Sequence, residues 1–162
     1  MKAASPNDQR ENGSVTIDEL NRRLLAELQR NARLSLAELG RRIGLSAPAV
    51  ADRLARLEEA GVIRGYHADL DPRALGFGLG AMLRIRPAPR ELKKVAELAQ
   101  RTPEVSEAHR ITGEDCYFVR LHVRDVEHLE EVIDRFAPYG QTTTSIVQSA
   151  PVPPRGLPVD SD

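Results

Sequence analysis

Three short helix patterns follow one another between Thr16 and Gly65, and their close spacing constrains the fold more than any other feature of the sequence. Apolar residues recur every three or four positions in each pattern, which is the period of a helix with one buried face. Gly44 ends the second pattern, and Ser46 can cap a third helix two residues later. A helix, a turn with glycine and a new helix are the layout of a helix-turn-helix, whose second member can enter a DNA major groove. The segment therefore predicts DNA binding.

Polar residues at the helix starts predict the caps, and the apolar faces predict the core. The pairs Thr16–Glu19 and Ser35–Glu38 fit the capping box, in which the hydroxyl accepts a backbone N–H and the carboxylate reaches back to the cap. About ten aliphatic side chains, at roughly 1.5–3 kcal/mol each, hold such a small unit only marginally. The expected core residues are Ile17, Leu20, Leu24, Leu25, Leu28, Leu36, Leu39, Ile43, Val50, Leu54 and Leu57.

The third helix leaves several residues on or beside its exposed face, and these are candidate DNA contacts. They are Ser46, Ala47, Pro48, Ala49, Asp52, Arg53 and Arg56. Small residues at the helix start let the backbone approach a groove, and the free N–H groups there favour phosphate. Arg53 and Arg56 lie one turn apart, which suits phosphate or base-edge contacts. The alternative is a solvated face on which both arginines pair with Asp52, Glu58 or Glu59. The following segment, VIRGYHADLD, predicts a strand at the usual place for a wing.

From Gly76 onward the apolar pattern changes to the period of strands. We expect a strand at 79–86, a helix at 90–102, strands at 104–113 and 116–123, a helix at 126–140 and a last strand at 142–149. The order βαββαβ is the ferredoxin-like arrangement, an antiparallel sheet with both helices on one face. Strands such as YFVRLHV are apolar on both sides, so we expect a second copy of the chain to cover the other face and make a homodimer.

Charge and composition set further bounds. Residues 17–66 carry nine arginines against seven acidic residues, and residues 67–162 carry twelve basic against fifteen acidic residues. A slightly basic front half suits a nucleic-acid module joined to a second domain. The single cysteine excludes an intrachain disulfide and fits a reducing compartment. No apolar run is long enough for a membrane span, and no signal peptide is evident, so we expect a cytoplasmic protein without membrane contact. Residues 1–15 and 151–162 are expected to be disordered.

Five phrases of the sequence, taken in order and with their spacing, resemble the Lrp/AsnC family, the feast/famine transcription regulators of bacteria and archaea. They lie between Ile17 and Ser149: IDELNRRLLAELQRNAR, LSAPAVADRLARLEEAGVIRGY, DPRALG, EVSEAHRITGEDCYF and TTTSIVQS. The resemblance implies an α+β chain, with an N-terminal winged helix-turn-helix at 16–66, a linker at 67–78 and a C-terminal ferredoxin-like domain at 79–150. It also implies that the C-terminal domains dimerise, often assemble into octamers, and bind an amino-acid effector between them.

The same resemblance assigns the effector site where residues match. In the family, an acidic, glycine-rich turn after the second sheet strand contacts the effector, and a Gly-x-x-Thr-x-Thr element precedes the last strand; here Gly140 opens that element. The residues assigned in this way are Gly113, Glu114, Asp115, Cys116, Thr142, Thr143 and Thr144. Cys116 stands where the family more often has an aspartate, while Tyr117 keeps the family's aromatic residue. Whether Asp115 takes over the role of that acid stays open, and so does the identity of the ligand.

The chemistry of the turn is consistent with a free amino acid as effector. A glycine turn beside an acid offers backbone N–H groups to a carboxylate and an oxygen to an ammonium group. The alternative is a tight hairpin with solvated charges.

Other chemistries find little support. Cys116 has no histidine or acid placed to make it a nucleophile, and His109, His122 and His128 lack a recognised metal-ligand spacing. The sequence therefore predicts no enzyme, no metal and no cofactor apart from an amino-acid effector. Two alternatives to an effector-responsive regulator of double-stranded DNA stay open. One is an architectural DNA-compacting protein of the same fold without an effector, and the other is an enzyme or metabolite sensor with a fortuitous helical segment.

Overall fold

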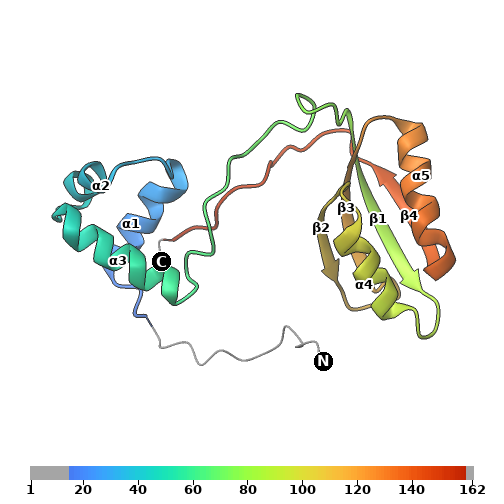
Figure 1. The fold of residues 1–162 in the computed structure, drawn as a ribbon, viewed down its shortest axis with the longest axis horizontal. Helices are drawn as coiled ribbons and strands as arrows, with labels where there is room; N and C mark the ends of the chain where they lie inside the picture. The colour runs from blue at the N-terminus through green and yellow to red at the C-terminus, as the bar shows by residue number, and fades with distance from the viewer. Residues whose placement is uncertain (1–14, 160–162) are drawn as a thin grey trace. The chain divides into compact units, whose positions relative to one another are not determined.

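The computed structural model describes residues 15–159, and the chain divides into two compact units. Among the described residues, the first unit contains 15–68 together with 154–159, and the second is Asp69–Pro153. Figure 1 shows the three helices of the first unit in blue to green and the four-stranded sheet of the second in green to red. The leader expected at 1–15 lies, apart from Val15, outside the described residues. None of the helices within residues 15–159 is long and apolar enough to cross a membrane.

The first unit holds three helices, whose caps the sequence predicts in part. They are α1 (Glu19–Arg30), α2 (Leu36–Ile43) and α3 (Ala47–Glu59). As expected, the hydroxyls of Ser35 and Ser46 accept N–H groups of the first turns of α2 and α3, those of Glu38 and Ala49. The carboxylate of Glu38 binds arginines instead of reaching back to Ser35. The cap expected at Thr16 is wrong. Asp18 caps α1, because its carboxylate accepts the N–H of Asn21 at 2.7 Å.

The turn between α2 and α3 depends on two glycines. Gly44 adopts the left-handed conformation (φ +79°) and donates its N–H to the carbonyl of Gly40 at 2.8 Å. Gly40 is buried, and a Cβ built on it would lie 2.3 Å from the backbone oxygen of Leu45. The backbone of the turn therefore rests directly on α2, and this contact sets where α3 begins.

Most of the expected helical core is present, and its exceptions share a cause. Leu24, Leu39, Ile43, Val50 and Leu57 are buried together, and Ile17, Leu25, Leu28 and Leu54 are partly buried against them. Leu20, the second residue of α1, was expected in this core but does not join it. Leu36 was expected inside but is 40% exposed, and in the second unit Val126, also expected inside, is 60% exposed. Each is the first residue of its helix. A helical period continues to the first residue of a helix, whereas the packed face starts about one turn later.

The strand expected for a wing does not form within residues 62–71, which carry neither helix nor strand. A strand needs a neighbour for its backbone hydrogen bonds, and residues 15–68 of the structure contain only helices and connections. Tyr66 instead holds this segment against α3 by donating its hydroxyl to Glu58 at 2.8 Å. Partial burial, together with this acidic partner, raises the pKa of Tyr66 to about 12.

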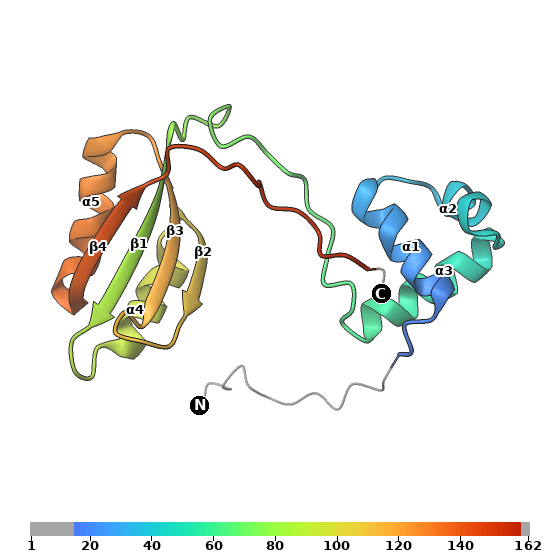
Figure 2. The same ribbon diagram turned by 180° about the vertical axis from the view of Figure 1, so that it is seen from behind.

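The second unit is the expected βαββαβ domain. Its elements are β1 (Leu79–Pro87), α4 (Leu92–Arg101), β2 (Val105–Arg110), β3 (Tyr117–Val123), α5 (Val126–Phe136), the short 3-10 helix η1 (Ala137–Tyr139) and β4 (Gly140–Ile146). The strands are antiparallel in the order β2-β3-β1-β4. Figures 1 and 2, which view the sheet from opposite sides, show α4 and α5 on the same face. The core lies between this face and the helices, where Leu83, Ile85, Val119, Leu121, Val95, Val132 and Phe136 are buried.

The other face of the sheet is more polar than the sequence predicted. Met82 and Phe118 are its apolar residues on the two central strands and are half-buried. The side chains that alternate with the buried core on these strands also include Arg84, Arg86, Arg120 and His122. The three positions of β3 that face away from the core hold only one large apolar side chain, Phe118. The expectation that this strand is apolar on both sides was therefore wrong.

The contact between α2 and the turn makes a prediction about Gly40. Replacing Gly40 by Ala should lower the free energy of unfolding of the helical unit by about 1–3 kcal/mol, because the new methyl group overlaps a backbone oxygen that cannot swing aside. Thermal unfolding followed by helical circular dichroism measures the change. Gly80→Ala is the matched control, since its methyl group would meet Val147 at an ordinary 3.6 Å. Equal losses in the two variants would contradict the assigned role of Gly40.

Candidate nucleic-acid interface and effector loop

The exposed side of α3 carries part of the predicted DNA-contacting set. Ser46, Pro48, Asp52 and Arg56 are exposed, whereas Ala47, Ala49 and Arg53 are half-buried. The guanidinium of Arg56 pairs with Asp52 at 2.5 Å, and the two side chains are 67% and 60% exposed. This is the solvated ion pair that the sequence analysis kept as an alternative for Arg56. Such exposed pairs are weak, so Arg56 can exchange Asp52 for a stronger anion such as a phosphate.

Arg53 has a different environment from Arg56. Its Nη1 donates to Asp18 at 2.8 Å and to the side-chain oxygen of Asn21 at 3.0 Å, so it ties α3 to the start of α1. The hydrogen bond from Arg53, assisted by the N–H of Asn21, holds the pKa of Asp18 below its ordinary value. Neither partner was among those proposed for Arg53 from the sequence, which considered acids on its own helix. Arg53 is therefore a positioning residue for α3, whatever DNA contact it also makes.

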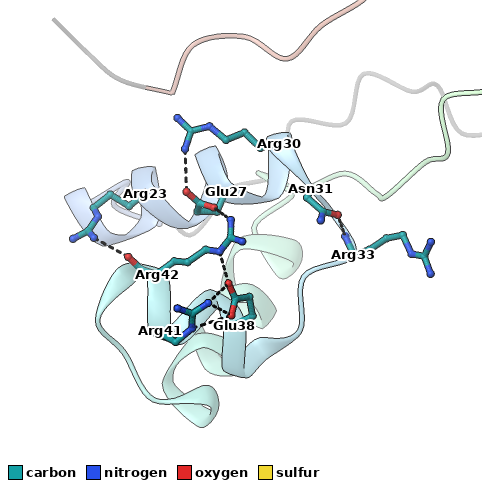
Figure 3. Close-up of polar contacts among 8 residues, drawn as sticks. All are labelled: Arg23, Glu27, Arg30, Asn31, Arg33, Glu38, Arg41 and Arg42. Atoms are coloured by element: carbon teal, nitrogen blue, oxygen red, sulfur yellow. Dashed lines mark hydrogen bonds and ion pairs between the residues drawn. The ribbon is translucent and has the colours of Figure 1, made fainter.

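A network of arginines and glutamates joins α1 to α2 on another side of the unit (Figure 3). Arg42 lies at its centre, donating to Glu27 of α1 and to Glu38 of its own helix, each at 2.7 Å. Arg30 also binds Glu27, Arg41 also binds Glu38, and Arg23 donates to the backbone carbonyl of Arg42 at 3.0 Å. None of these pairs was predicted from the sequence, although the i,i+3 and i,i+4 spacings within α2 are typical of the ion pairs that Glu38 makes.

The acidic turn of the predicted effector site follows β2, and its acids already have partners. Gly113 has a positive φ of 110°, which suits the tight turn. Glu114 forms an ion pair with Arg86, and the carboxylate of Asp115 lies 3.6 Å from the guanidinium of Arg84. Sequence reasoning missed both arginines, because they reach the turn across the sheet from β1.

The register of the sheet decides which of the predicted threonines join this turn. Thr143 lies opposite Arg84 in the β1–β4 pair, so the open face carries Asp115, Arg84 and Thr143 as neighbours. Thr142 and Thr144 lie opposite Ile85 and Leu83, and so they belong to the face that α4 and α5 cover. The structure therefore brings together part of the predicted set, and the pleat of β4 separates the rest.

The second unit also contains two hollows that the turn itself does not line. One, of about 190 Å³, is lined by Leu70, Pro72, Leu75, Phe77, Pro103, Glu104, Ser106 and His122. The other, of about 510 Å³, lies between α4 and β2. No residue of the predicted effector set lines either of them.

The remaining candidate groups have structural contacts. Cys116 is a half-buried free thiol whose backbone N–H donates to Ile85, and His109 pairs with Glu107 at 2.6 Å. His128 is buried against Glu104 at 2.8 Å. Burial would raise the pKa of Glu104, but hydrogen bonds from a backbone N–H, His128 and Arg135 outweigh it and lower that pKa. Within residues 15–159, no three His, Cys, Asp or Glu side chains are grouped as a metal site would require.

Comparison with known proteins covers both units. Residues 80–157 match the family model described as the Lrp/AsnC ligand binding domain, and residues 17–64 match the model described as a winged helix-turn-helix DNA-binding domain. An uncharacterised transcriptional regulator of Bacillus subtilis, YezC, is 37% identical over 83% of this chain and 95% of its own.

Solved structures share the architecture. The structure of LrpC from Bacillus subtilis has a TM-score of 0.81 at 29% identity and covers 84% of this chain and 97% of its own. The feast or famine regulatory protein of Mycobacterium tuberculosis, complexed with L-methionine, has a TM-score of 0.82 at 30% identity, covering 88% and 99% of the two chains.

The arginine–glutamate network makes the stability of the helical unit depend on pH. Hydrogen bonds from Arg42 and Arg41, respectively, lower the pKa values of Glu27 and Glu38 below the ordinary 4.5. The folded state therefore binds protons less readily than the unfolded chain, and the stabilisation is complete above pH 4.5 and is lost as the pH falls through the lowered pKa values. Denaturant unfolding at about pH 6 and about pH 3 should detect this loss.

The double variant Glu27→Gln/Glu38→Gln should lose less stability on acidification than the wild type does. Glu59→Gln is the matched control, since Glu59 is exposed at the end of α3. An acid sensitivity of the double variant equal to that of the control would contradict the role given to the network.

Proposed function

Because this chain belongs to the Lrp/AsnC family of transcription regulators, we propose that it binds specific sequences in double-stranded DNA and that an amino acid controls this binding. The observation that carries the proposal is the helix-turn-helix itself: α3 begins at the exposed Ser46 cap and presents Arg56 to solvent, while Arg53 fixes the helix against α1. The helix start supplies N–H groups for phosphate, and Arg56 supplies a donor for a phosphate or a guanine edge.

The effector part of the proposal rests on the turn beside β1. Arg84 and Asp115 face each other at 3.6 Å on the open sheet face, beside Thr143, and both side chains are partly exposed. A free amino acid carries a carboxylate that suits Arg84 and an ammonium group that suits Asp115. The methionine complex of the mycobacterial relative supports an amino acid as the class of ligand. Glu114, Cys116, Thr142 and Thr144 stay in the proposal as flanking residues.

Assembly and location follow from the same proposal. We propose a homodimer formed through the open face of the sheet, where Met82 and Phe118 are half-buried in the single chain, with octamers built from such dimers. A dimer suits DNA binding, because two helix-turn-helix units can occupy two half-sites about one helical turn apart. A regulator of chromosomal DNA works in the cytoplasm, which is the location that we propose.

A second candidate function is architectural, that is, compaction of DNA without an effector. The observation that favours it is the neutralisation of both acids of the turn, since Glu114 pairs with Arg86 and Asp115 with Arg84. An effector would have to compete with these pairs. The effector experiment below separates the two functions.

The DNA-binding proposal predicts different outcomes for the two arginines of α3. Arg56→Ala should weaken operator binding by about 1–3 kcal/mol if Arg56 contacts a base edge. If it contacts phosphate alone, binding should weaken uniformly across sequences, and the salt slope should fall by about one. Arg53→Ala should lower both DNA affinity and the melting temperature of the helical unit, because it releases α3 from Asp18.

Gel-shift titrations at several salt concentrations make the measurement. Arg101→Ala removes the same charge from α4 of the other unit and serves as the control. Unchanged affinity and salt slope in both α3 variants would remove α3 from the DNA interface.

The effector proposal predicts that one or more of the twenty amino acids raises the melting temperature. A ligand at a hundred times its Kd adds about 2.7 kcal/mol to the free energy of unfolding. Asp115→Ala should abolish this shift and the effect of the amino acid on DNA affinity, while effector-free DNA binding stays nearly intact. Asp134→Ala, which removes an exposed aspartate of α5, is the control. If no amino acid changes either observable in the wild type, the architectural function replaces the effector-controlled one.

A further inference from the structure

The C-terminal segment of the chain makes two contacts with α1. Residues 154–159 are part of the tail expected to be disordered at 151–162, whose last three residues lie outside the described ones; they carry no helix or strand, yet they belong to the helical unit. Arg22 of α1 donates its Nη1 to the backbone oxygen of Val159 at 3.2 Å. Gly156 lies directly on the side-chain amide of Gln29, so that a Cβ at this position would be 2.6 Å from the Gln29 Cδ. In Figures 1 and 2 the red end of the chain reaches the helices beside α1.

The spacing of these two contacts fits an extended peptide lying along a helix. Arg22 and Gln29 are seven residues apart in α1, so they share one side of the helix, about 10.5 Å apart along its axis. Three residues of extended chain, from Gly156 to Val159, span about 10 Å. Gly156 meets the later residue of α1 and Val159 the earlier one, so the tail runs antiparallel to α1.

The composition of the tail suits this binding mode. Pro153, Pro154 and Pro158 hold the backbone extended before it binds, which lowers the entropy that docking costs. Gly156 permits the close approach to Gln29. Val159 is half-buried, whereas Leu157 between them is 80% exposed. The tail is therefore held through its backbone and the half-buried Val159, and not through Leu157.

We infer that residues 154–159 dock on α1 of their own chain and form a second tether between the two units. The first connection runs from α3 to β1, and the second runs from β4 through residues 147–153 to the docked tail. None of the α3 side chains takes part in the two tail contacts. The tether therefore leaves the proposed DNA-contacting helix free while it limits how far the helical unit can turn. Its regulatory meaning rests on the proposed function, because β4 carries Thr143 of the effector site.

Limited trypsin digestion of the full-length protein tests the docking without DNA or effector. Cleavage after Arg155 releases GLPVDSD, which mass spectrometry follows directly, and docking should slow this release. The variant Arg22→Ala/Gln29→Ala removes both tail contacts and should release the peptide about tenfold faster than wild type does. Arg30→Ala, on α1 but outside these contacts, is the matched control. Equal release from wild type and the double variant would overturn the docking.

A second variant guards against misfolding of α1. Gly156→Val places a side chain against Gln29 from the tail side, so it should also speed release. Trypsin itself can respond to the new residue, so each release rate is divided by the cleavage rate of an isolated peptide of residues 150–162 with the same residue at position 156. Because the Gln29 side chain can swing aside, the docking is contradicted if neither this variant nor Arg22→Ala/Gln29→Ala releases the peptide faster than wild type. Protection that disappears on dilution would show instead that the tail of a second copy occupies α1, and it would overturn docking within one chain.

DNA binding tests the tether. Deletion of residues 154–162 should make the DNA affinity less dependent on the spacing of two half-sites, because a singly tethered unit reaches more positions. The ratio of the affinity at the best spacing to the affinity at a spacing shifted by half a helical turn should fall several-fold. An unchanged ratio would overturn the tether even if the tail docks. If the wild type binds no DNA, the proposed function fails, whereas the digestion result stands independently.

Discussion

The close contact between the backbones of α2 and the following turn is the constraint on which the DNA-binding half depends. Gly40 lies under the carbonyl of Leu45 with no room for a side chain, and Gly44 turns the chain so that Ser46 caps α3. Because the contact joins backbone to backbone, any side chain at position 40 would have to push the turn away from α2. The ion pair between Arg53 and Asp18 then ties the same helix to the start of α1.

Local signals in the sequence predicted the fold well. The caps at Ser35 and Ser46, the left-handed Gly44 and the two periods of apolar residues each depend on neighbours a few residues away, and each is present in the structure. The first cap went wrong because two residues close together, Thr16 and Asp18, can both act as caps, and a distant partner, Arg53, selects Asp18. The expected wing strand failed because it needed a pairing partner that the helical unit lacks.

The candidate sites were predictable in position more than in detail. A glycine and an acid locate the turn at 113–116, but the partners of its acids lie on β1 and become neighbours only through the pairing of strands. For the same reason Thr142, Thr143 and Thr144 were predicted as one group, whereas alternate residues of β4 face opposite sides of the sheet and only Thr143 lies opposite Arg84. The contact of the tail with α1 joins residues 137 positions apart and leaves no local pattern.

The internal pairing of the arginines bears on how this protein searches a chromosome. Arg30, Arg41, Arg42, Arg53 and Arg56 each face an acid of their own unit. Residues 17–66 carry only two more arginines than acids, so the positive potential that extends beyond a Debye length, about 8 Å in the cell, is small. Weak long-range attraction means short stays on random sequence and little sliding along the duplex. For the sequence-specific binding proposed above, this predicts arrival at a DNA site mainly by repeated diffusion through solution, with retention through the proposed contacts of α3.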